Sequence, residues 1–84
     1  MVLDASALLA VLFREEGYEE LLEELRRTRP HKVAAPTLAE AGIVLGARLG
    51  FERVDLLFEL LTELQAEIVP FTERHAREAI SAYR

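Results

Sequence analysis

The chain contains no cysteine and no tryptophan, and its aromatic residues are limited to two tyrosines and four phenylalanines. The absence of cysteine excludes a disulfide framework and a thiolate zinc site, and it is typical of proteins in a reducing cytoplasm. Because 51% of the residues are hydrophobic and so few are aromatic, we expect an aliphatic core made mainly of leucine. The length of 84 residues allows one domain, near the small end for a self-sufficient core.

Basic residues are also scarce: ten Lys and Arg stand against fifteen Asp and Glu, for a net charge of −5. This balance argues against broad electrostatic binding to nucleic acid, but not against a nuclease that holds a metal through carboxylates. The apolar run at residues 1–13 is too short to cross a bilayer and lacks the basic segment and cleavage site of a secretory signal. We therefore expect a cytoplasmic protein without a membrane segment.

Two carboxylates interrupt apolar runs that offer no Lys or Arg. Asp4 is the only charged residue in MVLDASALLAVLF, and Glu40 is the only one in VAAPTLAEAGIVLGA. A carboxylate directed toward an apolar interior must be hydrogen-bonded, paired or bound to a metal, so a shared divalent cation is a candidate. Helix capping is the alternative. Asp4 and Ser6 are competing caps for the first predicted helix, and Thr37 with Glu40 matches a T-x-x-E capping box.

Short predicted strands alternate with longer predicted helices along the chain. The pattern predicts strands at 2–3, 32–35 and 67–69, and helices at about 6–14, 18–27, 37–48, 51–64 and 73–84. The helix at 37–48 is apolar nearly all round, which predicts burial on most sides. The apolar face of the helix at 51–64 is wide enough to predict a second contact surface, such as another subunit. His31 follows Pro30 in a polar loop and is expected to face solvent.

The alternating order predicts right-handed crossovers and a parallel sheet. Asp4 falls at the end of the first strand, and Glu40 falls early in the helix that follows the second strand. Ligands gather at the carboxyl ends of strands in open parallel sheets. We therefore expect both carboxylates at the same edge of the sheet.

Three segments, VLDASALLA, APTLAEAGIVL and IVPFT, resemble the PIN-domain family in their order and spacing. The resemblance covers residues 1–84 and is closest to the VapC-type toxin ribonucleases of toxin–antitoxin pairs. It implies an α/β, Rossmann-like three-layer fold, with a short parallel sheet of three strands flanked by about five helices. In this family a third acid, and often a fourth, lies in a C-terminal segment whose strands pair beside the first strand. We therefore expect residues 1–84 to form a single partial PIN-like domain that lacks its C-terminal strands and helix.

The resemblance also implies a function. Asp4 and Glu40 match the family's first two metal-binding acids, and Ser6 matches a hydroxyl residue near the first. We expect these three to be the catalytic residues of a Mg²⁺- or Mn²⁺-dependent endoribonuclease, with RNA as substrate and a VapB-like antitoxin as partner. The alternative is a catalytically inactive, truncated remnant that forms a homo-oligomer (a dimer or higher) or binds an antitoxin-like helix. A purely structural α/β fragment without a ligand is a third reading.

Overall fold

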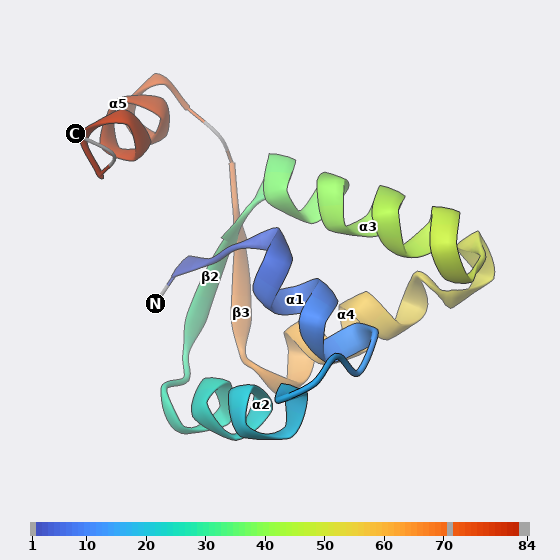
Figure 1. The fold of residues 1–84 in the computed structure, drawn as a ribbon. Coiled ribbons are helices and arrows are strands. Elements are labelled where there is room, and N and C mark those ends of the chain that lie inside the picture. Colours follow the sequence, from blue (N-terminus) through green and yellow to red (C-terminus); the bar gives the residue numbers. More distant parts are fainter. Residues whose placement is uncertain (1, 71, 83–84) are drawn as a thin grey trace.

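A computed structural model describes residues 2–70 and 72–82 of the chain, without the side chains of residues 75, 78, 79 and 82. Strands and helices alternate along the chain (Figure 1). The elements are β1 (Val2–Leu3), α1 (Ala5–Leu12), α2 (Tyr18–Arg27), β2 (His31–Ala34), α3 (Ala35–Leu49), the 3₁₀ turn η1 (Phe51–Arg53), α4 (Asp55–Glu63), β3 (Ala66–Val69) and α5 (Glu73–Ala82).

The three strands form one parallel sheet in the order β1-β2-β3. Leu3 lies opposite Val33, and Val33 lies opposite Ile68 on the next strand. Among the described strands, β1 pairs with β2 only. The predicted α/β fold with a short parallel sheet is therefore confirmed.

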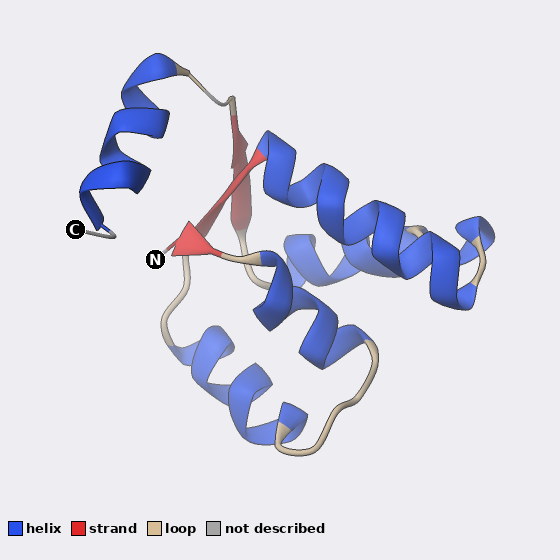
Figure 2. Ribbon diagram, turned by 45° about the horizontal axis from the view of Figure 1, so that its top comes forward, coloured by secondary structure: helices blue, strands red, loops and turns tan. Residues whose placement is uncertain are grey.

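Helices α1 to α4 gather on one side of the sheet, where they build the core (Figures 1 and 2). Leu3 and Val33 point into this core from the sheet, and most of the helical core residues are leucines. The fully enclosed ones include Leu8, Leu45, Leu57 and Leu64. The expectation of a leucine-rich, aliphatic core is therefore correct.

The helix predicted at 51–64 is broken in the structure. Gly50 ends α3 with a φ of 98°, a conformation that glycine adopts without steric cost, and Phe51 then begins η1 rather than a continuous helix. The ring of Phe51 lies against Gly46, where an added Cβ would stand 2.2 Å from Phe51 Cδ1. This contact lies beside the turn between α3 and α4, and α4 begins only at Asp55.

Helices α3 and α4 both leave apolar side chains in solvent. In α3, residues such as Ala41 and Leu45 are buried, but Ile43 on the outer side is 63% exposed. The expectation that α3 is buried on most sides is wrong, because α1, η1 and the strands β2 and β3 cover only its inner side. In α4, Leu57 is enclosed while Phe58 is exposed. The wide apolar face of α4 is thus only partly covered within one chain.

Helix α5 follows β3 and lies on the side of the sheet away from α3 (Figures 1 and 2). In both views it stands apart from the body formed by the other elements. The predicted continuation of this helix to residue 84 includes residues 83–84, which lie outside the described residues. No helix in the described part of the chain is long and apolar enough to cross a membrane.

Candidate metal site at the carboxyl edge of the sheet

Asp4 lies where β1 ends and α1 begins. Its backbone is extended, and its Oδ1 accepts a 2.8 Å hydrogen bond from the backbone N–H of Ala7. Asp4 is therefore the N-cap of α1, one of the readings that the sequence left open. The cap occupies only Oδ1, so the second carboxylate oxygen of this exposed side chain is available to a ligand.

Ser6 is the second residue of α1, and its side chain is exposed. The alternative in which Ser6 caps this helix is wrong, because α1 begins at Ala5, immediately after Asp4. The Ser6 hydroxyl makes no hydrogen bond with any residue that the structure describes. The hydroxyl lies two residues from Asp4, at the same end of α1.

Glu40 lies in the second turn of α3. The capping-box reading is wrong, because α3 begins at Ala35 with Ala34 as an N-cap that makes no side-chain hydrogen bond. Pro36 is tolerated in the first turn, where its missing N–H has no intrahelical partner. The Glu40 carboxylate is exposed, and it has no hydrogen bond or ion pair with any described residue.

The two carboxylates were expected to face an apolar interior, and this expectation is wrong. Both Asp4 and Glu40 are exposed. Asp4 stands at the open carboxyl edge of the sheet, and Glu40 belongs to the outer side of α3, together with the exposed residues Ala39 and Ile43. Water can therefore solvate both carboxylates, and neither is forced into the core.

The fold nevertheless brings the elements that carry these acids together. Leu3 pairs with Val33, so the residues that come next, Asp4 and Ala34, both lie at the carboxyl edge. Helix α3 begins directly after Ala34. Helices α1 and α3 pack against each other. Within the described residues no group of three or more His, Asp or Glu side chains is placed to hold a metal ion. The candidate site therefore consists of Asp4 and Glu40, with Ser6 beside the first.

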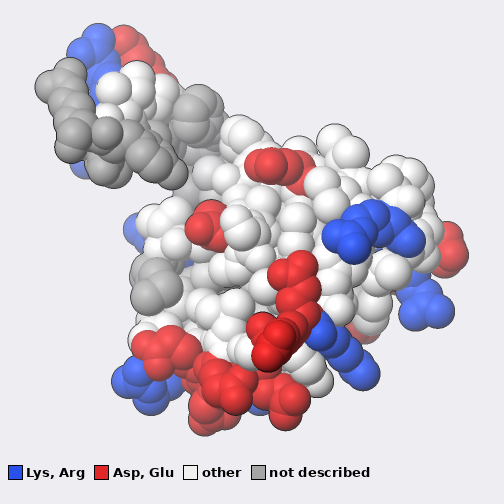
Figure 3. Space-filling model, in the orientation of Figure 1, with Lys and Arg blue, Asp and Glu red and all other residues white. Residues whose placement is uncertain are grey.

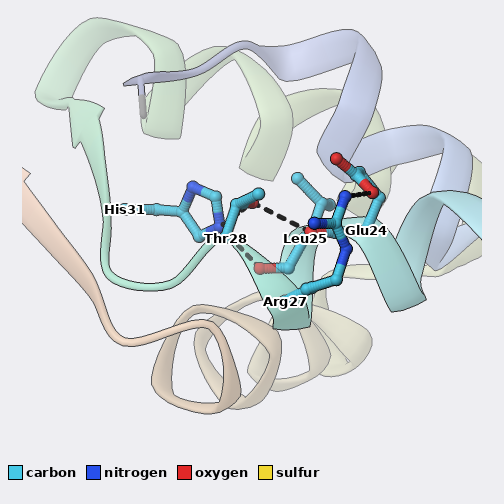
Figure 4. Close-up of polar contacts among 5 residues, drawn as sticks. All are labelled: Glu24, Leu25, Arg27, Thr28 and His31. Atoms are coloured by element: carbon cyan, nitrogen blue, oxygen red, sulfur yellow. Dashed lines mark hydrogen bonds and ion pairs between the residues drawn. The ribbon is translucent and has the colours of Figure 1, made fainter.

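His31 is a buried residue that the sequence pattern placed in solvent. It is 1% exposed, and its Nε2 donates a 2.7 Å hydrogen bond to the backbone carbonyl of Leu25 (Figure 4). Its Nδ1 has no hydrogen-bond partner in the part of the chain that is described. His31 begins β2, at the amino edge of the sheet, so it lies at the opposite end from Asp4. The prediction that His31 faces solvent in a loop is wrong, because its ring binds the Leu25 carbonyl near the end of α2.

An ion pair lies on α2, the helix whose Leu25 carbonyl binds this histidine. Arg27 pairs with Glu24 one turn earlier in α2 (Figure 4). The hydrogen bond to Glu24, together with the charge of that carboxylate, raises the pKa of the Arg27 guanidinium above its ordinary value. Arg27 is thus a charged surface residue that pairs within its own helix.

A second surface feature is a groove of about 400 Å³ between α1, α2 and α4. Its lining is mainly apolar, with three charged residues. The lining includes Val11, Leu12, Tyr18, Leu22, Leu56 and Leu60, with Arg14, Glu59 and Glu63 at the charged positions. Figure 3 shows that acidic side chains gather over the α2 side of the molecule, and Glu19, Glu20, Glu23 and Glu24 are all exposed there. The sequence pattern did not predict this groove, because three helices form it.

Comparison with known proteins identifies the fold. Residues 1–84 match the PIN domain family. The chain is 32% identical over 83 residues to the ribonuclease VapC28 of Mycobacterium tuberculosis and to a VapC ribonuclease of Mycobacterium bovis, which covers 99% of this chain and 62% of each relative. It is 30% identical over 84 residues to the ribonuclease VapC42 of Mycobacterium tuberculosis, covering 100% of this chain and 64% of that relative.

The matches cover nearly the whole of this chain. The chain spans about three fifths of the length of these curated relatives. The family match agrees with an α/β fold in which helices separate the strands of a short parallel sheet. Sequence and fold lead to the same conclusion: the chain belongs to the PIN-domain family.

Proposed function

We propose that the chain is a VapC-type, metal-dependent endoribonuclease domain that hydrolyses RNA phosphodiester bonds in the cytoplasm. The observation that carries this proposal is the Glu40 carboxylate. It is exposed on a largely apolar helix, it caps nothing, and it has no partner among the described residues. A carboxylate with no structural role, on a helix packed against the one that Asp4 caps, is suited to ligand binding. The relatives named as ribonucleases support RNA as the substrate.

The donor set fits a hard divalent cation, and we name Mg²⁺ or Mn²⁺. Asp4 and Glu40 offer carboxylate oxygens, the ligand type that these ions prefer. Such a cation, when bound, supplies an activated water and offsets the negative charge that develops on the phosphate. Two carboxylates leave most of an octahedral shell to water and RNA oxygens. We therefore expect weak metal binding in the absence of RNA.

Each of the three residues has a distinct part in this proposal. The Asp4 carboxylate is held in place by its bond to the Ala7 N–H, so its free oxygen points from a fixed position. Glu40 projects from a helix, which restricts where its carboxylate can reach. The Ser6 hydroxyl, two residues from Asp4, orients that carboxylate or a water bound nearby.

The test is a ribonuclease assay on the purified chain with Mg²⁺ or Mn²⁺. We expect cleavage by the unmodified chain, and loss of cleavage with Asp4→Asn, with Glu40→Gln and after chelation of the metal. Glu59→Gln is the matched control, because Glu59 is an exposed acid on α4, away from the carboxyl edge. Activity that is absent, or that survives Asp4→Asn and Glu40→Gln, contradicts the proposal.

A second candidate function is a partner-binding module, and the groove favours it. Leu56 and Leu60 of α4 line the groove together with Val11 of α1 and Leu22 of α2, and such an apolar lining suits the apolar side of a helix. Glu59 is an exposed acid in its lining and attracts basic residues of a partner, whereas Glu63 is already paired with Arg26. We propose an antitoxin-like amphipathic helix, apolar on one side and basic beside it, as the occupant.

Co-purification with the protein encoded beside this chain tests the second candidate. Leu56→Glu places a charge in the groove and should abolish co-purification. Leu49→Glu places the same charge on an exposed leucine at the end of α3 and should leave it unchanged. Equal capture by both variants contradicts a role for the groove.

We further propose that the chain forms a homo-oligomer through the outer sides of α3, η1 and α4. Ile43, Phe51 and Phe58 are large apolar side chains that remain exposed there, and Phe51 is 66% exposed. Apolar side chains of this size at the surface favour contact with a second subunit. Light scattering should give a mass above that of the monomer. The Phe51→Ser substitution should reduce this mass. A well-folded monomer at all concentrations contradicts this proposal.

A further inference from the structure

Arg48, in the last turn of α3, packs on an aromatic ring that belongs to α1. Its Cζ atom lies 4.2 Å from the centre of the Phe13 ring, and Phe13 is the residue at which α1 ends. Helices α1 and α3 begin on neighbouring strands, beside Asp4 and Ala34 at the carboxyl edge of the sheet. The contact between Arg48 and Phe13 therefore lies at the far end of this helix pair from the candidate metal site.

The N–H groups of the Arg48 guanidinium are available to a ligand. The side chain is exposed, and it makes no hydrogen bond or ion pair with any described residue. Arg26 and Arg27 differ in this respect, because each pairs with a glutamate. Attraction between the cation and the aromatic ring engages one face of the guanidinium, whereas its donors lie in the plane of the group. A position in the last turn of a helix favours a cation without using these donors.

Phe13 gives the arginine a fixed support. The backbone N–H of Phe13 donates a 2.8 Å hydrogen bond to the Leu9 carbonyl, and the side chain is half-buried against the core. A guanidinium that already rests on an anchored ring loses less freedom when it binds a ligand. The two residues thus form a preorganised cationic site between α1 and α3.

Neither α1 nor α3 carries a further acid between the metal site and this contact. No residue is charged at positions 5–13 or 41–47. Figure 3 shows uncharged surface between the acidic group over the start of α3 and the basic group over its end. Many of the acids behind the net charge of −5 lie elsewhere, such as the four glutamates of α2. A phosphate chain can therefore follow these two helices without meeting another of their carboxylates.

The length of the helices decides which phosphate Arg48 can contact. Glu40 and Arg48 are eight residues apart on α3, which corresponds to a rise of about 12 Å. Asp4 and Phe13 are separated by the whole of α1, which is also about 12 Å long. A guanidinium resting on Phe13 therefore cannot contact a phosphate held at the two acids. The phosphate that it binds must be another one along the same strand.

We propose that Arg48, stacked on Phe13, binds a second phosphate of a single-stranded RNA whose scissile phosphate lies at Asp4 and Glu40. This inference rests on the proposed ribonuclease function and adds a substrate contact to it. Arginine suits the role because its planar donors match phosphate oxygens, and phosphate contacts fix the position of a strand. One cation beside an uncharged surface fits one backbone better than the two backbones of a duplex. Phe13 is a positioning residue that acts through Arg48.

The first experiment measures RNA binding without cleavage. A fluorescein-labelled oligouridylate of about ten nucleotides is titrated with the Asp4→Asn chain in the absence of metal, and its anisotropy is followed. Adding Arg48→Gln should weaken binding at least about fivefold at low salt. It should also make the slope of log K against log salt shallower by about 0.7, because one phosphate contact is lost.

Arg27→Gln, added to the same Asp4→Asn chain, is the matched control. It removes the same charge from the last turn of α2, so any effect of net charge or of the helix dipole is preserved. We expect it to change neither the affinity nor the salt slope. Equal affinities for the Arg48→Gln and Arg27→Gln chains overturn the proposal, and so does a chain that binds no RNA.

The second experiment tests the stacked arrangement. Phe13→Leu keeps an apolar side chain against the core but removes the ring, and Arg48→Lys keeps the charge but removes the planar donors. Each should weaken RNA binding by about twofold to fivefold. The unfolding midpoint of the Arg48→Lys chain should stay close to that of the unmodified chain. Unchanged RNA affinity in both variants overturns a guanidinium held by the ring.

The third experiment varies the length of the RNA in a cleavage assay with Mn²⁺. For a substrate of about ten nucleotides, Arg48→Gln should raise KM several-fold and leave kcat unchanged, because the contact is the same before and during the reaction. Cleavage of a dinucleotide, which is too short to extend to Arg48, should not change. Equal losses for both lengths show that Arg48 acts through the fold and overturn the proposal. RNA binding that depends on Arg48 in a chain that never cleaves contradicts the proposed ribonuclease function and leaves the arginine contact intact.

Discussion

The Asp4 carboxylate accepts a 2.8 Å hydrogen bond from the backbone N–H of Ala7, at the point where β1 passes into α1. One side chain therefore has a structural role and a proposed chemical one. The cap uses Oδ1, and the other oxygen remains for a cation. The two roles place different demands on the residue, since a cap needs an acceptor and a metal ligand needs a negative charge.

Variants of Asp4 should separate these roles. Asp4→Asn keeps an acceptor for the Ala7 N–H and should cost less than about 1 kcal/mol in the free energy of unfolding, whereas Asp4→Ala should cost about 0.5–2 kcal/mol. Both should abolish metal-dependent cleavage. Urea denaturation and a ribonuclease assay on the same samples check the two effects. A stable Asp4→Asn chain with full activity would show that the cap is the only role of Asp4.

The contact between Gly46 and Phe51 predicts a dependence between two substitutions. Gly46→Ala should destabilise the chain by about 1 kcal/mol, near the low end for overpacking, because the exposed ring of Phe51 can move aside. In a Phe51→Ala background the same change should stabilise by up to about 1 kcal/mol, because alanine favours a helix over glycine. Thermal or urea unfolding of the four chains measures the difference. Additive effects would show that the ring does not rest on Gly46.

Loss of the buried His31 should destabilise the chain without altering the candidate site. His31→Ala removes the donor to the Leu25 carbonyl and leaves space in the core, with an expected cost of about 2–3 kcal/mol. His31→Gln retains a donor and should cost less. Mn²⁺ affinity of the folded variants should stay within about twofold of the unmodified chain, because His31 lies at the opposite edge from Asp4. Unfolding midpoints equal to that of the unmodified chain would contradict the described hydrogen bond.

The arrangement of the sheet could be predicted from local pattern because each strand is short and carries apolar residues, and the first and third are followed by residues that stop them. Val2-Leu3 ends at Asp4, and Ile68-Val69 ends at Pro70. Helix α2 was equally clear, since its leucines and glutamates alternate with helical spacing. From three strands separated by helices, the parallel order and the position of Asp4 at the carboxyl edge follow by topology.

Local sequence pattern gave wrong predictions where the outcome depends on contacts with a neighbouring helix or strand. Asp4 and Ser6 are both good caps, and the choice between them was decided by where β1 ends. Pro36 suits the first turn of a helix, so α3 begins before Thr37 and leaves Glu40 without a capping role. His31 is buried because the Leu25 carbonyl meets it across a loop. The pairing of Asp4 with Glu40 in a metal site stays a prediction.

The most direct test of that pairing is a Mn²⁺ titration monitored by calorimetry. The chains compared are the unmodified chain, Asp4→Asn, Glu40→Gln and the double variant, with Glu59→Gln as control. If the two carboxylates share one ion, each single change should weaken binding at least about tenfold, and the double variant should bind little worse than either single variant. Equal affinity in all five chains, or losses that simply add, would contradict a shared site at Asp4 and Glu40.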